Sequence, residues 1–265
     1  MKNKVAESAA KVGAALALAM MGSSIAMAQE APVAEHTVAY NAALTTEYRY
    51  RGLSQSRFDP ALQGGVDYTH NPTGFYVGTW ASTIKWIKDA GRIAGVDVGG
   101  ANVEVDIYGG YKGSVMEGLG YDVGLLQYWY PRNKLDRAAP LEKADTLEAY
   151  GALTYGPVTA KYSHALTDTF GNPDSKNSYY FDLSASFEIT DGWMLAPHVG
   201  RQKIKGPFDD GASYTDYSLA VSKDFSGFVV SAAAVGTNAD KTFYVTPSGK
   251  FTGKNALVVG VKYNF

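Results

Sequence analysis

The chain of 265 residues contains no cysteine, no marked excess of charge of either sign and no long hydrophobic run. Without cysteine it has no disulfide scaffold, no thiolate zinc site and no cysteine nucleophile. The chain has a formal net charge of -2 and so lacks the excess of basic residues that is typical of nucleic-acid-binding proteins. We therefore expect no nucleic-acid partner. Its apolar runs are shorter than the about 20 residues that a membrane-spanning helix requires. A helical membrane protein is therefore excluded as well.

Glycine and tyrosine, in contrast, are abundant, with 29 and 19 residues, and aromatic residues make up 13% of the chain. The mean hydropathy is nevertheless slightly negative, at -0.16. The length suits one large domain or two small ones. A chain rich in tyrosine and glycine but not strongly apolar favours an all-β protein.

The N-terminus has the pattern of a secretory signal peptide. Lys2, Lys4 and Lys11 precede a short apolar stretch, and the small residues Ala26 and Ala28 follow it. A retained anchor helix is the alternative, and the shortness of the apolar stretch argues against it. We predict that residues 1–28 are a signal peptide cleaved after Ala28 and that residues 29–265 form the exported domain.

Apolar and polar side chains alternate in many segments of about ten residues, which is typical of half-buried strands. The alternation predicts twelve strands, at 38–50, 61–70, 75–84, 102–112, 120–130, 146–155, 158–167, 179–189, 193–202, 213–224, 228–237 and 256–265. Near Gln127 the alternation is lost, which predicts either a bulge in that strand or a different register from the one assigned. Pro197 predicts a weak point in its own strand, because proline donates no ladder hydrogen bond.

Long and short connections alternate between these strands. The short ones, at 71–74, 114–119, 156–157, 190–192 and 225–227, mostly carry the Gly, Pro, Asn and Asp residues of tight turns. The long ones are 51–60, 85–101, 131–145, 168–177, 203–212 and 238–254. Outer-membrane barrels have short periplasmic turns and long outside loops. The fold class predicted is therefore all-β, a single closed antiparallel transmembrane β-barrel in the cell outer membrane.

Alternation also assigns the two faces of the wall. Lipid is expected to contact the even positions of the first strand and the odd positions of the last, with Tyr48 and Tyr50 at the outer rim. The opposite parity faces the lumen, and it selects these pore-lining residues: Glu47, Arg49, Arg51, Asp67, Glu104, Asp106, Tyr108, Lys112, Asp122, Glu148, Lys161, Asp182, Glu188, Asp216 and Lys262.

The C-terminal strand carries a possible assembly signal. Its residues Leu257, Val259, Val261, Tyr263 and Phe265 resemble the terminal strand that the barrel-assembly machinery of Gram-negative bacteria reads. The simpler interpretation is an amphipathic strand that happens to end in phenylalanine. The sequence therefore suggests two partners: outer-membrane lipid and the barrel-assembly machinery.

Several stretches resemble the TorF family of porin-like proteins. They include residues 44–56, which read LTTEYRYRGLSQS, residues 59–68 and 74–78, and the segments 104–111, 121–124, 161–163, 214–217 and 221–224. The resemblance covers most of residues 29–265 and is densest in the first two strands. It implies an outer-membrane barrel and transfers no catalytic residue.

The expected function is passive diffusion of small hydrophilic solutes. Because acids outnumber bases among the predicted pore-lining residues, we expect a weak cation preference, with Arg49 and Arg51 opposing acids across the channel. Two alternatives stay open: a structural or surface-interaction barrel with a plugged lumen, and an outer-membrane hydrolase using His164. No serine faces His164, so we assign no catalytic residue.

No cofactor or metal is assigned from the sequence. Asp168, Asn172 and Asp174 lie in one loop, but their spacing does not match the EF-hand pattern. The glycines of 85–101 lack the Gly-Lys-Ser/Thr ending of a phosphate loop.

Overall fold

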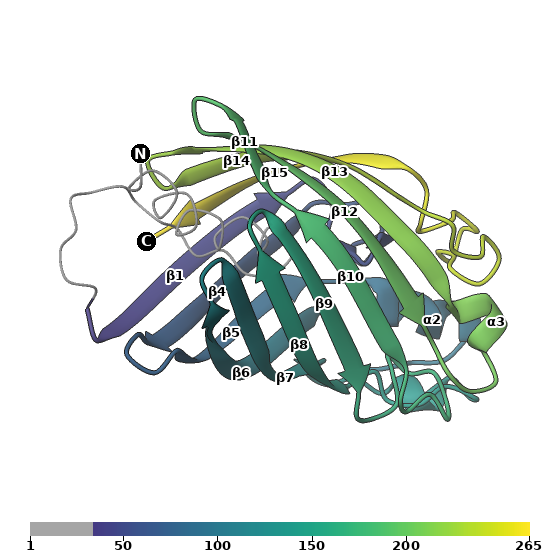
Figure 1. Cartoon of the computed structure of the whole chain (residues 1–265). Helices are drawn as coiled ribbons and strands as arrows, with labels where there is room; N and C mark the ends of the chain where they lie inside the picture. Colours follow the sequence, from purple (N-terminus) through teal and green to yellow (C-terminus); the bar gives the residue numbers. More distant parts are fainter. Residues whose placement is uncertain (1–33) are drawn as a thin grey trace, which may run out of the picture.

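The computed structural model describes residues 34–265, which form one closed antiparallel barrel (Figure 1). The predicted signal peptide and its cleavage site lie outside the described residues. The strands of the barrel wall are β1 His36–Thr45, β4 Ala61–His70, β5 Phe75–Thr83, β6 Val103–Met116, β7 Leu119–Trp129, β8 Thr146–Tyr155, β9 Val158–Ala165, β10 Tyr179–Ala185, β11 Phe187–Thr190, β12 Trp193–Lys203, β13 Tyr214–Phe225, β14 Phe228–Thr237 and β15 Ala256–Asn264. Because β10 and β11 share one position in the ring, the barrel has twelve positions, as predicted.

The ring closes through two pairings. β1 pairs with β4 on one side and with β15 on the other, while β12 pairs with both β10 and β11. Within residues 34–265, every wall strand except the short β11, which pairs only with β12, therefore has a paired neighbour on each side. This closure is what lets a β structure lie in lipid, where an unpaired backbone group finds no hydrogen-bond partner.

Pro197 coincides with a break in the wall, as the sequence predicted. Leu195 pairs with Phe187 of β11 and His198 with Ser184 of β10, so Pro197 lies opposite the gap between those two strands. The bulge predicted near Gln127 is wrong. Leu126 and Tyr128 point inward in regular register because the alternation continues there, and the register shift lies between Ser114 and Met116.

The two ends of the barrel differ. At one end, called the short-turn end, the strands are joined by tight turns, and β1 begins and the chain ends there, at the left of Figure 1. The other, the long-loop end, carries α2 Trp86–Ala94, η3 Leu135–Arg137 and α3 Asp209–Ala212. Within residues 34–265, no helix is both long and apolar enough to cross a membrane.

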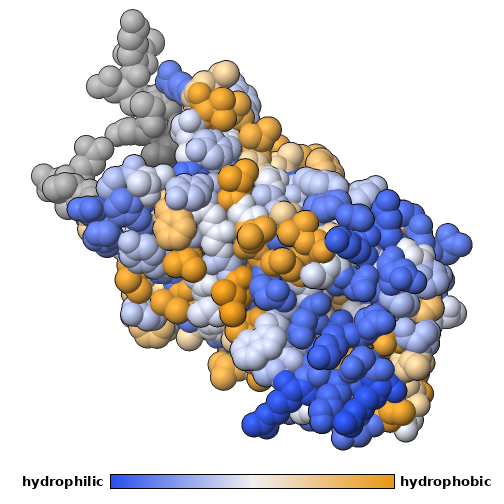
Figure 2. All heavy atoms as spheres, turned by 90° about the horizontal axis from the view of Figure 1, so that it is seen from below, coloured by the Kyte–Doolittle hydropathy of each residue, from blue (hydrophilic) through white to orange (hydrophobic). Residues whose placement is uncertain are grey.

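The outward face of the wall is apolar. Leu44, Leu62, Leu125, Leu219 and Leu257 are each about half exposed or more. Figure 2 shows hydrophobic side chains over the barrel wall, while hydrophilic side chains crowd the right-hand side, toward the long-loop end. An apolar belt with a polar end is the surface expected of a barrel that lies in lipid.

The first strand is shorter than predicted. β1 ends at Thr45 instead of at residue 50, and the following segment does not lie outside the barrel. Tyr48 and Tyr50, expected at the outer rim, are 3% and 9% exposed. The parity rule gave the wrong face because it assumes that the chain continues as a strand, whereas here it turns inward.

Inside the wall, tyrosine rings lie over glycines of the adjacent strand. A Cβ on Gly78 would lie 2.5 Å from the Tyr108 ring, and one on Gly124 would lie 2.6 Å from the Tyr150 hydroxyl. Gly200 meets the Tyr180 hydroxyl in the same way. In these pairs the ring needs a neighbour without a side chain, which accounts for part of the abundance of both residue types.

This packing gives a first prediction. Replacing Gly78 by alanine should destabilise the barrel by about 1–3 kcal/mol, because the added methyl group displaces the Tyr108 ring. Gly120→Ala is the control, since its Cβ would meet nothing closer than 3.5 Å. Urea unfolding in detergent micelles, followed by tryptophan fluorescence, measures both variants. Equal midpoints for the two would show that the ring has room to move.

Candidate functional site: a loop across the lumen

Residues 46–60 form an inner loop that folds back into the barrel. It contains a small hairpin, β2 Arg49–Tyr50 paired with β3 Leu53–Ser54. The two residues at its tip, Arg51 and Gly52, have φ of 45° and 80°. Two successive positive φ values define the tight turn that suits a two-residue hairpin. Gly52 also has no space for a side chain, since a Cβ there would lie 2.7 Å from the Cβ of Asp216.

The tip of the hairpin is bound to the far wall. The Arg51 guanidinium donates to both carboxylate oxygens of Glu148 on β8, at 3.0 and 2.8 Å, and to Gln202 on β12 at 2.5 Å. It also lies over the Tyr180 ring of β10, 4.2 Å from the centroid. These strands stand across the ring from β1, so the hairpin spans the lumen.

Two tyrosines of the inner loop bind the β6–β7 side of the wall. The Tyr48 hydroxyl donates to Glu104 at 2.6 Å, and the Tyr50 hydroxyl donates to Tyr128 at 2.8 Å. All four side chains are buried. Together with other tyrosines of the wall they form a core inside the barrel, near the long-loop end.

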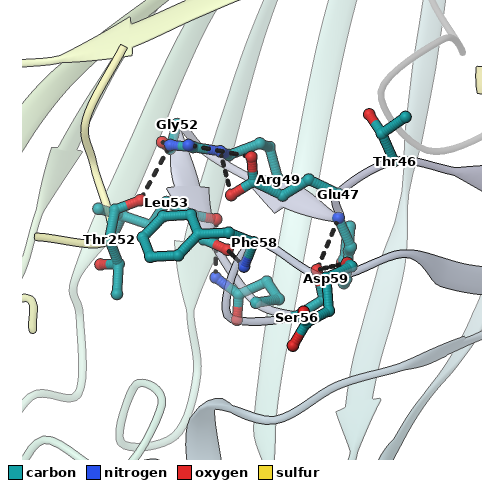
Figure 3. Close-up of polar contacts among 12 residues, drawn as sticks. Thr46, Glu47, Arg49, Gly52, Leu53, Ser56, Phe58, Asp59 and Thr252 are labelled. Carbon is teal, nitrogen blue, oxygen red and sulfur yellow. Dashed lines mark hydrogen bonds and ion pairs between the residues drawn. The ribbon is translucent and has the colours of Figure 1, made fainter. Parts of the chain in front are cut away.

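The base of the hairpin is tied to the last long loop (Figure 3). Arg49 donates from Nη1 to the carbonyl oxygens of Gly52 and Thr252, at 2.8 and 2.9 Å. Its Nε lies 2.9 Å from Glu47 in an ion pair whose side chains are 5% and 8% exposed. Arg49 therefore holds the shape of the loop itself, whereas Arg51 holds the loop to the wall.

The outer part of the inner loop is anchored to α2. The Nε of Arg57 donates to Asp89 at 2.7 Å, and this hydrogen bond raises the pKa of Arg57. Lys85, just before α2, donates to Asp59 at 2.5 Å. The loop is thus fixed at its base, tip and outer end.

Charged side chains of the wall, at the level of the hairpin and below it, pair with tyrosines or with one another. The hydroxyls of Tyr108 and Tyr76 donate to Asp67 and Asp122, each at 2.5 Å. Other contacts in this region include Lys161 over the Tyr150 ring at 4.2 Å, His198 with Asp182 at 2.5 Å, and Tyr180 to Asp216 at 3.0 Å.

The structure thus gathers most predicted pore-lining residues inside the wall. Glu104, Asp106, Tyr108, Glu148 and Asp216 are buried there. Asp67, Asp122, Lys161, Asp182 and Lys262 are half-buried on wall strands. Glu47 and Arg49 lie on the inner loop and not, as predicted, on the first strand, and Arg51, predicted just after that strand, lies at the tip of the same loop. The reason is the inward turn after Thr45, which removes these three from the wall.

Two predicted pore-lining residues lie toward the short-turn end. Lys112 is exposed, with its ammonium 5.7 Å from the centroid of the Tyr76 ring, and Glu188 is exposed and accepts a hydrogen bond from the backbone of Gly192. Asp106, in contrast to the exposed Lys112 and Glu188, is buried. It is 2% exposed, and its Oδ1 finds no hydrogen-bond partner within residues 34–265.

The inner loop itself is what the sequence reasoning missed. A signal was present, because Arg51-Gly52 between Tyr50 and Leu53 is compatible with a two-residue hairpin turn. The suggested assembly residues Leu257, Val259, Val261 and Phe265 are exposed on the outer face of β15 and at the chain end.

The alternative sites weighed from the sequence have local structural partners. The ring nitrogens of His164 contact the Tyr162 hydroxyl and the Asn177 side chain, each at 3.2 Å. Asp168 accepts from the backbone nitrogens of Ser175 and Lys176, at 2.8 and 3.0 Å. Both residues hold their loop in shape by these contacts.

Comparison with known proteins gives one family. A family model described as "Bacterial protein of unknown function (Gcw_chp)" matches residues 29–265. The search of curated proteins found no match.

Two of the solved structures with a similar fold are porins. The NanC porin is 10% identical, with a TM-score of 0.53 over 86% of this chain and 99% of that one. The KdgM porin in complex with disordered oligogalacturonate is 7% identical, with a TM-score of 0.50 over 86% and 98% of the two chains. At such identities the likeness shows a shared barrel fold.

Proposed function

Because the chain belongs to the Gcw_chp family of bacterial proteins, whose function is unknown, we propose a function from its barrel: a narrow outer-membrane channel for small hydrophilic solutes. The observation that carries this proposal is a closed wall, apolar outside, around a lumen lined with charges and tyrosines and crossed by the inner loop. The short-turn end then faces the periplasm and the long-loop end faces outward. Solutes pass between the hairpin and the wall.

The charges around the hairpin support a weak cation preference. The carboxylates at this level outnumber the basic side chains there, which are Arg49, Arg51, Lys161 and His198. The carboxylates are Glu47, Glu104, Asp106, Glu148, Asp182 and Asp216. Opposed charges in a narrow passage set both a size limit and a selectivity.

Planar-bilayer recording of the purified protein tests this function. We expect discrete current steps of small conductance, and in a KCl gradient a reversal potential of the sign given by a modest preference for K⁺. Arg49→Ala should increase that preference, because the neighbouring Glu47 carboxylate loses its counter-charge. A reversal potential of the opposite sign in the wild-type protein would contradict the cation preference.

A second candidate function follows from the same loop. The ion pair between Arg51 and Glu148 is nearly solvent-free, with side chains 7% and 2% exposed, which suits a permanent plug. A plugged barrel would act through its outer loops. If the barrel is plugged, the wild-type protein gives no current steps, and only a variant without the hairpin conducts. The wild-type recording therefore distinguishes the plugged barrel from the channel.

Three further assignments belong to the same proposal. The first is similarity to the TorF family, and the second is an exported precursor that is cleaved after Ala28. The third is recognition of Phe265 and its strand by the barrel-assembly machinery. All three are consistent with an outer-membrane barrel. A catalytic role is not part of the proposal, since His164 is engaged by Tyr162 and Asn177.

A further inference from the structure

Two histidines and a glutamate meet at the short-turn end, away from the inner loop. His36 is the first residue of β1, and His70 is the last residue of β4. The two are direct partners in the antiparallel register, and their rings lie 5.0 Å apart. Glu35 immediately precedes β1. Residues distant in sequence are thus brought together by strand pairing.

The potential ligand atoms of the three residues converge. The Nε2 atoms of His70 and His36 lie 3.4 and 3.6 Å from the same oxygen, Oε1 of Glu35. All three ligand atoms lie within 4.8 Å of one another. Ligands bound tetrahedrally at about 2.1 Å from a zinc ion are about 3.4 Å apart. The observed spacing already approaches that value.

The other nitrogen of each ring is held by a polar neighbour. The Nδ1 of His36 lies 2.8 Å from the Tyr68 hydroxyl, and the Nδ1 of His70 lies 2.7 Å from the Thr73 hydroxyl. Histidines that bind metal typically donate from their second nitrogen to such a partner, which fixes the ring and its tautomer. With the proton on Nδ1, each Nε2 presents its lone pair toward the Glu35 carboxylate.

The backbone of the glutamate is also positioned in advance. The backbone nitrogen of Asn71 donates to the Glu35 carbonyl at 2.9 Å. The Asn71 side chain donates to the Ala34 carbonyl at 2.7 Å and to the Thr37 hydroxyl at 2.8 Å. The segment before β1 is therefore tied to the turn after β4, and little ordering is needed to bind an ion.

We propose that Glu35, His36 and His70 form a binding site for a divalent transition-metal ion of the zinc class, with water completing the coordination. Two imidazoles and one carboxylate suit zinc, copper and nickel better than magnesium or calcium. Glu35 and His36 are exposed and His70 is half-buried, so an ion can reach the site from solution. This site is independent of the proposed channel.

Calorimetric titration with Zn²⁺ tests the site, using the full chain in detergent, without a polyhistidine tag and after treatment with a chelator. We expect saturable binding of one ion per chain. His70→Ala should weaken binding more than about tenfold, and Thr73→Val should weaken it by about 10–100-fold through loss of the Nδ1 partner. His164→Ala is the matched control, because this histidine lies outside the cluster, and it should bind as the wild type does.

A difference in gel mobility between unboiled and boiled samples, as for the wild type, shows that each variant still forms a barrel. No saturable binding to the wild type, or equal binding by the wild type and His70→Ala, would overturn the proposal. Binding that is lost in His70→Ala but unchanged in Thr73→Val would overturn the role given to the second ring nitrogen. Neither result depends on whether the lumen conducts.

Discussion

Removing the tip of the hairpin should increase the single-channel conductance several-fold. The change is a replacement of residues 50–53 by two glycines, which deletes Arg51 and its bonds to Glu148 and Gln202. The physical reason is that the tip reaches the wall across the ring and occupies the lumen there. Planar-bilayer recording of the variant beside the wild type measures the change.

The control is a matched change outside the lumen. Residues 247–250 form an exposed turn of the last long loop, and the same Gly-Gly replacement there should leave the conductance unchanged. If the tip deletion conducts no better than the wild type, the narrowest point of the lumen lies elsewhere, and the inner loop is not the constriction.

Replacing Arg51 by alanine should release the hairpin from the wall. This change leaves the Glu148 carboxylate buried without its counter-charge, at a cost of about 3–5 kcal/mol for a buried pair broken on one side. Because backbone hydrogen bonds between the strands hold the barrel wall, we expect this cost to destabilise the bound position of the inner loop and not the wall. We expect rapid fluctuations between current levels, seen as excess noise in single-channel records.

The double variant Arg51→Met with Glu148→Gln checks this cause. It removes the charge from both partners, so no uncompensated charge is left at this contact, and the current should again be quiet. Arg49→Ala offers a second comparison. Its partner Glu47 lies on the same loop, and the noise should be smaller. Equal noise in all three variants would show that loss of either arginine simply unfolds the loop.

The wall was predictable from the sequence because each of its strands has one apolar and one polar face. A period of two is a local property, and it located β8 and β14 at their observed bounds. The short turns were equally local, because Gly156 tolerates the positive φ of 55° that its turn requires and proline, as at Pro157, has a fixed φ.

The inner loop was not predictable in this way. Residues 46–50 continue the alternation of β1, and only contacts with strands far along the chain decide that they turn inward. Tyr48 is polar enough to bind Glu104 and apolar enough to suit a membrane rim, so its residue type does not separate the two positions. The histidine pair was missed for a similar reason, since it depends on the register of β1 with β4.

The contacts of the hairpin tip also bear on the order in which the protein folds. Arg51 binds one residue that is 97 positions later in the chain and another that is 151 positions later. Contacts with so large a sequence separation form late, because the intervening chain must first be ordered. The loop lies inside a ring that closes when β1 meets β15. The hairpin near the N-terminus therefore reaches its final position only after strands from the middle and the later part of the chain, β8 and β12, are in place.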